Sequence, residues 1–118
     1  MTEPNILSSL SSALSETIAR AAPAIVSVHS HRARASGFVW KAGLIVTADE
    51  ALADEGEIEI QFADGSRRPA TVVGRDHTTD IALLRVESDV APAKLSTAAP
   101  ALGSLAVIVA ADRGAPSA

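Results

Sequence analysis

Two carboxylates, Asp49 and Glu50, stand at the end of an apolar run in the segment GLIVTADEAL, residues 43–52. The segment is typical of a buried strand that runs into a helical turn. A third carboxylate, Asp80, comes directly before another apolar run, IALLRV. Carboxylates can act as general bases, but a free Glu titrates at a pKa of about 4.3, well below the neutral pH at which a base is efficient. Glu50 is therefore predicted to be a poor base unless its surroundings perturb it strongly.

The three histidines are further candidates for acid–base or metal chemistry. His77 lies three residues before Asp80 on a polar turn, and we interpret it as a solvated loop residue rather than a general base. His29 and His31 are two residues apart in an expected strand and would share one face, so a metal pair is conceivable. No third ligand with suitable spacing is evident, and an exposed strand face is the preferred interpretation.

The acidic segment DEALADEGE could attract a cation. Its carboxylates do not follow the spacing of a calcium-binding loop, so we expect a solvated acidic loop. The carboxylates are those of Asp49, Glu50, Asp54, Glu55 and Glu57.

Taken alone, Asp80 is most simply interpreted as a carboxylate that caps a turn through HTT. The sequence thus predicts neither a metal nor a cofactor.

The composition narrows the function classes. The chain has 118 residues, 47% of them hydrophobic, which is enough for one compact domain with a core. A formal net charge of −4 argues against a dedicated nucleic-acid binder, which normally carries a basic face. The absence of cysteine excludes disulfides, zinc–thiolate sites and thiol nucleophiles. No segment approaches the roughly 18–20 apolar residues that span a bilayer, and the N-terminus lacks the pattern of a secretion signal.

An amphipathic helix is predicted at the N-terminus, over residues 5–21. Apolar residues recur there every four positions, with polar residues between them, which places one apolar stripe on the helix. Pro23 ends the helix, because proline cannot donate to the helical hydrogen-bond ladder. The residues of the stripe are Ile6, Leu10, Leu14 and Ile18.

Short alternating or β-branched runs predict strands in the rest of the chain. AIVSVHSH and EIEIQF alternate in polarity, SGFVW and GLIVT form a hairpin around KAG, and ADGS supplies an Asp-Gly turn into RRPATVVGRD. DIALLRV is the next strand, and GSLAVIVAA is one more apolar strand after a low-complexity connector. Arg32 and Arg34 are expected in an exposed hairpin loop. Short strands with tight turns, after a single helix, predict an all-β (mostly) fold, a small antiparallel barrel or sandwich.

The segments APAIVSV, SGFVW with GLIVTADEAL, IEIQFADGSRRPATVVGRDHTTDIALLRVE and GSLAVIVA follow one another with characteristic turns. In this order they resemble the N-terminal half of HtrA/DegP-like serine proteases of the trypsin-like superfamily, over roughly residues 13–112. The resemblance implies a trypsin-like N-terminal six-stranded antiparallel β-barrel preceded by one α-helix. It divides the chain into an N-terminal helix (1–22), the first β-barrel (23–90), and a linker with the first strand of a missing second barrel (91–118).

The resemblance also implies roles for the carboxylates. VGRDHTTDIALLRVE matches the strand that carries the family's catalytic aspartate, which falls on Asp80. GLIVT leads in the family into a tripeptide that bears the catalytic histidine, and that position is occupied here by Glu50. A carboxylate does not copy the two-ended geometry of an imidazole, which takes the serine proton and returns it to the leaving group. The nucleophilic serine is implied in a Gly-rich segment of the second barrel, and Ser104 and Ser117 come too early and lack that context.

The function that follows is a catalytically inactive HtrA-like domain, a pseudoprotease with a residual peptide-binding or assembly role. Its partners would be the missing C-terminal protease half or an HtrA-like relative, and peptide or unfolded protein if the cleft is completed. The alternative is a non-enzymatic interaction module, a half-barrel that self-associates as a homo-oligomer through a strand over residues 104–111. The family suggests the periplasm if a leader was removed, and the cytoplasm is expected otherwise.

Overall fold

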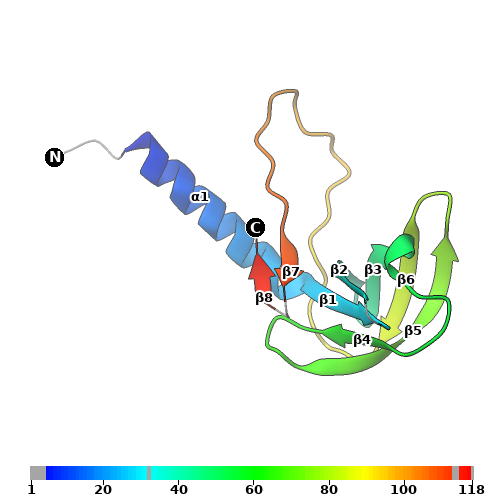
Figure 1. Ribbon diagram of the computed structural model, residues 1–118. Coiled ribbons are helices and arrows are strands. Elements are labelled where there is room, and N and C mark those ends of the chain that lie inside the picture. Colours follow the sequence, from blue (N-terminus) through cyan, green and yellow to red (C-terminus); the bar gives the residue numbers. More distant parts are fainter. Residues whose placement is uncertain (1–4, 32, 113–114, 118) are drawn as a thin grey trace.

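The computed structural model describes residues 5–31, 33–112 and 115–117. Six strands close into a barrel in the order β1-β2-β3-β6-β5-β4, and every neighbouring pair is antiparallel (Figure 1). The strands are β1 (Ile25–Ser30), β2 (Ala33–Lys41), β3 (Leu44–Ala48), β4 (Ile58–Gln61), β5 (Arg67–Asp76) and β6 (Ile81–Val86). The predicted six-stranded antiparallel barrel preceded by one helix is confirmed.

The barrel interior is filled by aliphatic side chains that alternate along the strands. Successive strand residues point to opposite faces, so the inward positions recur with a period of two. Burying one such side chain contributes roughly 1.5–3 kcal/mol. The largest hydrophobic side chains that are fully buried are Val26, Val28, Val39, Ile45, Ile60 and Leu84. These residues hold the strand ends, and therefore the turns at the barrel's edge, in a fixed arrangement.

Both predicted hairpin turns are present. The β2–β3 turn contains Gly43 and the β4–β5 turn contains Gly65, each with a positive φ, of 78° and 88°, that favours glycine. In the second turn, Asp64 Oδ1 accepts hydrogen bonds from the backbone N–H and the hydroxyl of Ser66, at 2.9 and 2.6 Å. These hydrogen bonds lower the pKa of Asp64. The turn chemistry predicted from ADGS is therefore what joins these strands.

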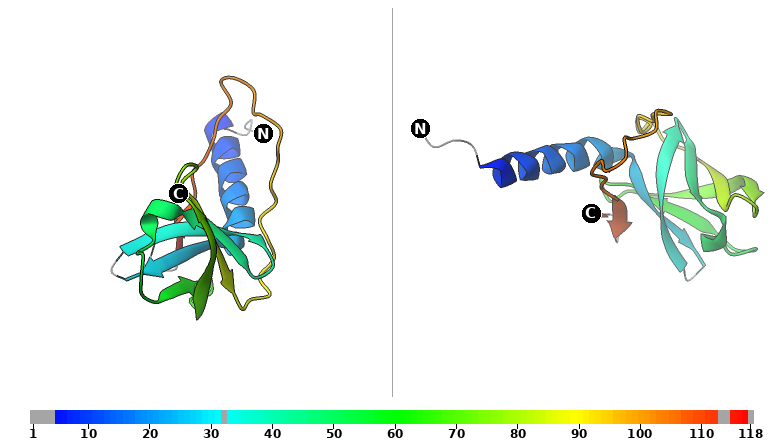
Figure 2. Two further views of the ribbon diagram at one scale, coloured as in Figure 1. Left: turned by 90° about the vertical axis from the view of Figure 1, so that its right-hand side faces the viewer. Right: turned by 90° about the horizontal axis from the view of Figure 1, so that it is seen from above.

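The predicted helix forms as α1 (Ile6–Ala21) and projects away from the barrel (Figures 1 and 2). Asn5 caps it, because its side-chain oxygen accepts the backbone N–H of Leu7 at 2.8 Å. Pro23 lies in the first turn of the short 3₁₀ helix η1 (Ala22–Ala24) that follows, where its missing N–H is tolerated. No residue of α1 is buried. None of the described helices is long and apolar enough to cross a membrane.

The C-terminal strand differs from the prediction. A strand was expected over residues 104–111, but residues 104–109 have no regular structure, and β7 (Ala110–Asp112) is short and pairs with β8 (Ala115–Ser117). Among the described residues no strand pairs with 104–109, and an extended segment needs a partner to form a strand. β7 is tied to the barrel by Ser36 of β2, whose Oγ accepts the backbone N–H of Ala111 at 3.0 Å.

Two expectations near the β1–β2 turn are also wrong. Arg34 lies in β2 rather than in a hairpin loop, because β2 begins at Ala33 and pairs Arg34 with His29; Arg32 lies outside the described residues. His31 does not share a strand face with His29. It occupies the turn with a φ of 55°, a left-handed conformation in which His is enriched among non-glycine residues.

Candidate functional site

Asp80 and Glu50 meet at one edge of the barrel. Strands β3 and β6 are paired up to Ala48 and Ile81, so the residues just beyond this pair are neighbours across the sheet. Asp80 Oδ1 accepts the backbone N–H of Glu50 at 2.8 Å, and the Asp80 carbonyl accepts that of Asp49 at 3.1 Å. The structure thus brings together the two positions that the sequence pattern linked.

Asp80 adopts a strained backbone conformation to make these contacts. Its φ of 57° lies in the left-handed region, which Asp tolerates better than most residues. The strain is offset by the two hydrogen bonds, which hold both its carbonyl and its carboxylate against the short 3₁₀ helix η2 (Asp49–Ala51). Non-glycine residues with positive φ are frequent at functional sites, where the surrounding structure imposes the conformation.

Asp49 is buried, and its place in a solvated loop was wrongly predicted. Only 3% of the residue is exposed, and Arg75 binds its carboxylate through Nε at 2.5 Å. The hydrogen bond from Arg75, followed by its positive charge and that of His77, lowers the pKa of Asp49, although burial opposes the shift. A buried carboxylate requires such a partner. Sequence reasoning did not identify this ion pair.

Arg75 also fastens the segment that carries Glu50. Its guanidinium donates to three backbone carbonyls, those of Asp49 at 3.1 Å, Leu52 at 3.3 Å and Ala53 at 3.4 Å. From the barrel side, Ser30 Oγ accepts the backbone N–H of Ala53 at 2.9 Å. The planar, multiply donating guanidinium suits such a role, which a lysine would not fill. The turn after β3 is therefore held from β5 and from β1.

The other acidic residues match the expected solvated loop. Asp54 has a side chain that is 95% exposed and approaches Arg75 Nη1 at 3.6 Å, and Glu50, Glu55 and Glu57 are exposed. A hollow of about 350 Å³ adjoins Glu50 and is lined also by His31 and Leu52. Within the described ranges, no group of three or more His, Cys, Asp or Glu side chains could hold a metal ion.

The histidines fall in different surroundings. His77 is solvated as expected, with a side chain 82% exposed, but its Nδ1 also contacts Asp49 Oδ2, which was not foreseen. His29 Nε2 lies 3.0 Å from Ser27 Oγ. Burial, followed by the nearby positive charges of Arg34 and Arg67, lowers the pKa of His29. His77 therefore contacts the residue next to Glu50, and His31 lines the hollow beside Glu50.

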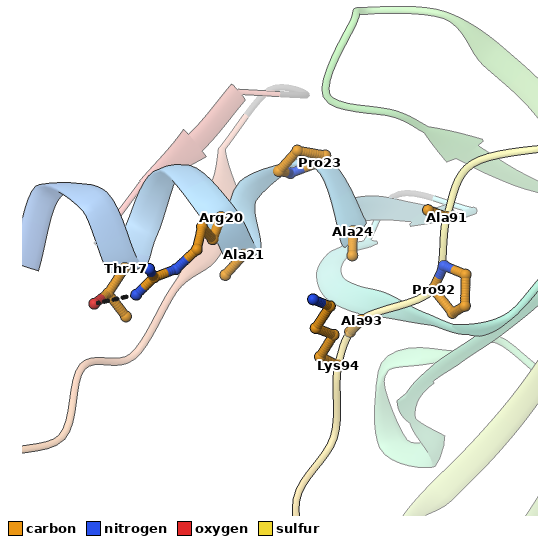
Figure 3. A pocket seen from close by; sticks show the side chains of 9 residues that line it. All are labelled: Thr17, Arg20, Ala21, Pro23, Ala24, Ala91, Pro92, Ala93 and Lys94. Atoms are coloured by element: carbon orange, nitrogen blue, oxygen red, sulfur yellow. Dashed lines mark hydrogen bonds between the residues drawn. The ribbon is translucent and has the colours of Figure 1, made fainter.

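A separate pocket of about 490 Å³ lies between the end of α1 and the segment after β6 (Figure 3). Small apolar residues form much of its lining, with the basic side chains of Arg20 and Lys94 beside them. Arg20 turns back toward Thr17, whose hydroxyl it approaches at 3.5 Å. None of the lining residues belongs to the Asp49, Glu50 and Asp80 cluster.

Comparison with known proteins places this geometry in a family. The model of the trypsin-like peptidase domain matches residues 35–118. A protein of Chlamydia pneumoniae named as a DegP-like periplasmic serine endoprotease is 40% identical over 60 residues, 50% of this chain and 12% of that protein. The serine protease HTRA4 of Mus musculus is 42% identical over 55 residues, 46% of this chain and 11% of that protein.

The fold agrees with that relationship. The crystal structure of the serine endoprotease from Yersinia pestis superposes with a TM-score of 0.63 and 30% identity, over 67% of this chain and 31% of that one. The stretches that match the two curated relatives cover only 12% and 11% of the length of those proteins. This chain belongs to the family of trypsin-like peptidase domains and is related within it to the HtrA/DegP-like serine proteases.

Proposed function

We propose that this chain is the first-barrel part of an HtrA-like domain that does not carry out ordinary serine-protease turnover at this site. Its remaining role is to bind peptide or to assemble with a second barrel or with an HtrA-like relative. The division into residues 1–22, 23–90 and 91–118 is part of this proposal, as is the assignment of Asp80 and Glu50 to the aspartate and histidine positions.

One observation carries the proposal: the hydrogen bond from the Glu50 backbone N–H to Asp80 Oδ1. In a Ser-His-Asp arrangement the aspartate orients an imidazole, which accepts the serine proton at one nitrogen while the other donates to the carboxylate. Here the residue held by Asp80 is itself a carboxylic acid. An ionised Glu side chain has no proton to donate to Asp80. The contact therefore supports a site in which Asp80 is retained at the aspartate position, while the residue at the histidine position cannot act as the matching base.

The test is proteolysis by the intact chain, with an active HtrA protease as the positive control. We expect no cleavage of casein and no labelling by a fluorophosphonate probe, because that probe reacts with a serine activated by a neighbouring base. A labelled serine, located by mass spectrometry, would contradict the proposal. So would casein cleavage that Asp80→Asn abolishes.

A second candidate function is self-association without enzymatic activity. The observation that favours it is the exposed apolar surface on two segments outside the barrel. On α1 the exposed residues include Ile6 and Leu7, at 83% and 71%, and after the barrel they include Leu102, Leu105 and Ile108, at 106%, 68% and 85%. Extended apolar patches are uncommon on soluble monomers. Light scattering over a dilution series tests this: a 12.1 kDa monomer at every concentration would exclude it.

A further inference from the structure

Asp49 and His77 form a carboxylate–imidazole pair next to the Asp80 site. His77 Nδ1 contacts Asp49 Oδ2, while Arg75 Nε binds the other oxygen of the same carboxylate. Asp49 is also linked to Asp80 through its backbone N–H. The pair is therefore built from residues that the proposed function leaves unused, within a few residues of the Glu50 position.

The contact fixes which ring nitrogen of His77 carries the proton in the neutral form. An ionised carboxylate can only accept hydrogen bonds, so Nδ1 must be the protonated nitrogen. The other nitrogen, Nε2, then keeps its lone pair. The side chain is 82% exposed, so that lone pair is open to solvent and to a substrate. In histidine sites generally, the hydrogen bond made by one ring nitrogen determines whether the other nitrogen is protonated.

The carboxylate is rigidly placed and stays ionised. Asp49 is 3% exposed, and Arg75 holds both its side chain and its carbonyl. The charged groups around His77 include the carboxylates of Asp49 and Asp76, and the guanidinium of Arg75 binds the other oxygen of Asp49. Hydrogen bonds from Thr78 and Thr79, and more weakly the charge of His77, lower the pKa of Asp76, so this carboxylate too is ionised at neutral pH. Two carboxylates thus lie near the ring to stabilise a positive charge that forms on it.

We propose that Asp49 and His77 are an oriented dyad whose Nε2 accepts a proton or an acyl group, with activated acyl esters as the substrate class. In the acyl-transfer step, the Nε2 lone pair bonds to the acyl carbon, and the ester C–O bond breaks with its electron pair leaving on the alcohol oxygen. Asp49 stabilises the positive ring that results. Water then attacks the acyl carbon of this acyl-imidazolium, and the C–Nε2 bond breaks with its electron pair returning to Nε2. The proton that the water loses goes to the alkoxide, so the products are the carboxylic acid, the alcohol and the neutral ring.

The first experiment reads the tautomer directly. Long-range proton–nitrogen NMR of the intact chain at pH 8.5, where the imidazoles are neutral, distinguishes the protonated ring nitrogen of each histidine. We expect His77 to carry its proton on Nδ1, and Asp49→Ala to remove that preference. A wild-type His77 protonated mainly on Nε2 would overturn the proposal, whether or not the Asp49 variant folds.

The second experiment measures reactivity with p-nitrophenyl acetate. His77→Gln should lower the protein-dependent release of nitrophenolate by at least about twofold, because one oriented imidazole is expected to carry most of it. His31→Gln is the matched control, since His31 is also an exposed turn histidine, and it should lower the rate by less. Equal losses in the two variants would overturn the proposal. Neither outcome bears on casein cleavage, so the proposed function is tested separately.

Discussion

Replacing Gly37 with alanine tests how tightly β2 and β3 pack at the base of the site. A Cβ at Gly37 would stand 2.8 Å from the Val46 carbonyl oxygen and 3.1 Å from Ile45 Cγ2. Carbon atoms pack at about 3.5 Å, so the contact with Ile45 Cγ2 would be too short by about 0.4 Å. The contact with the Val46 carbonyl oxygen is with backbone, which cannot rotate away as a side chain can. The two strands must therefore move apart.

Overpacking of this kind costs about 1–3 kcal/mol. In a domain of this size we expect Gly37→Ala to lower the melting temperature by about 4–12 °C. Gly74→Ala is the matched control, because Gly74 also lies in a strand, has no positive φ, and has nothing within 4 Å of its added Cβ. Circular dichroism melts of the three proteins decide the matter. Equal melting temperatures for the Gly37 and Gly74 variants would refute the packing argument.

Three further outcomes are expected. Because the pKa of Asp49 is lowered in the folded state, its ion pair with Arg75 stabilises the fold above about pH 4. This stabilisation is lost as the pH falls through the folded pKa. The melting temperature should therefore fall more steeply from pH 6 to pH 2 for the wild type than for Arg75→Gln. Leu84→Ala, at a fully buried position, should cost about 2–5 kcal/mol in urea unfolding, whereas Leu95→Ala, 59% exposed, should change the unfolding free energy little. Ser30→Ala removes the acceptor for the backbone N–H of Ala53 and should cost about 1–3 kcal/mol, seen as a lower urea midpoint with an unchanged slope.

The local features of the fold could be predicted from the sequence because their causes lie close together in the chain. The helix follows from a four-residue apolar repeat and Pro23, and the β4–β5 hairpin follows from Asp64 and Gly65 within one turn. The inward residues of the strands follow from alternation, as in Ile58 and Ile60 of β4. Each of these signals is contained in a few consecutive residues.

The environment of Asp49 could not be predicted, because its partner is 26 residues away in the chain. Arg75 reaches the site only because β5 and β6 pair Arg75 with Ala82, and β3 and β6 pair Ala82 with Thr47. A bulge between Val72 and Gly74 shifts that register, and no local pattern reveals it. With the strand order and the bulge in hand, the placement of Arg75 beside the turn after β3 would have followed.

The extent of the C-terminal strand was mispredicted for a similar reason. Residues 104–109 have the composition of a strand, but strand formation depends on a pairing partner as well as on propensity. The described residues supply a partner only from Ala110 onward. His31 was assigned to a strand because the alternation continues through it, whereas the tight turn into β2 requires its left-handed conformation.

The central claim, that position 50 is where Asp80 would orient a catalytic imidazole, is tested most directly by the Glu50→His variant. Its imidazole is titrated by NMR and identified by difference from the three native histidines. We expect a pKa raised above the ordinary value of about 6.5, because the nearby Asp80 carboxylate stabilises the charged ring, and a return toward that value when Asp80→Asn is added. An imidazole with an ordinary pKa that does not respond to Asp80→Asn would contradict the claim.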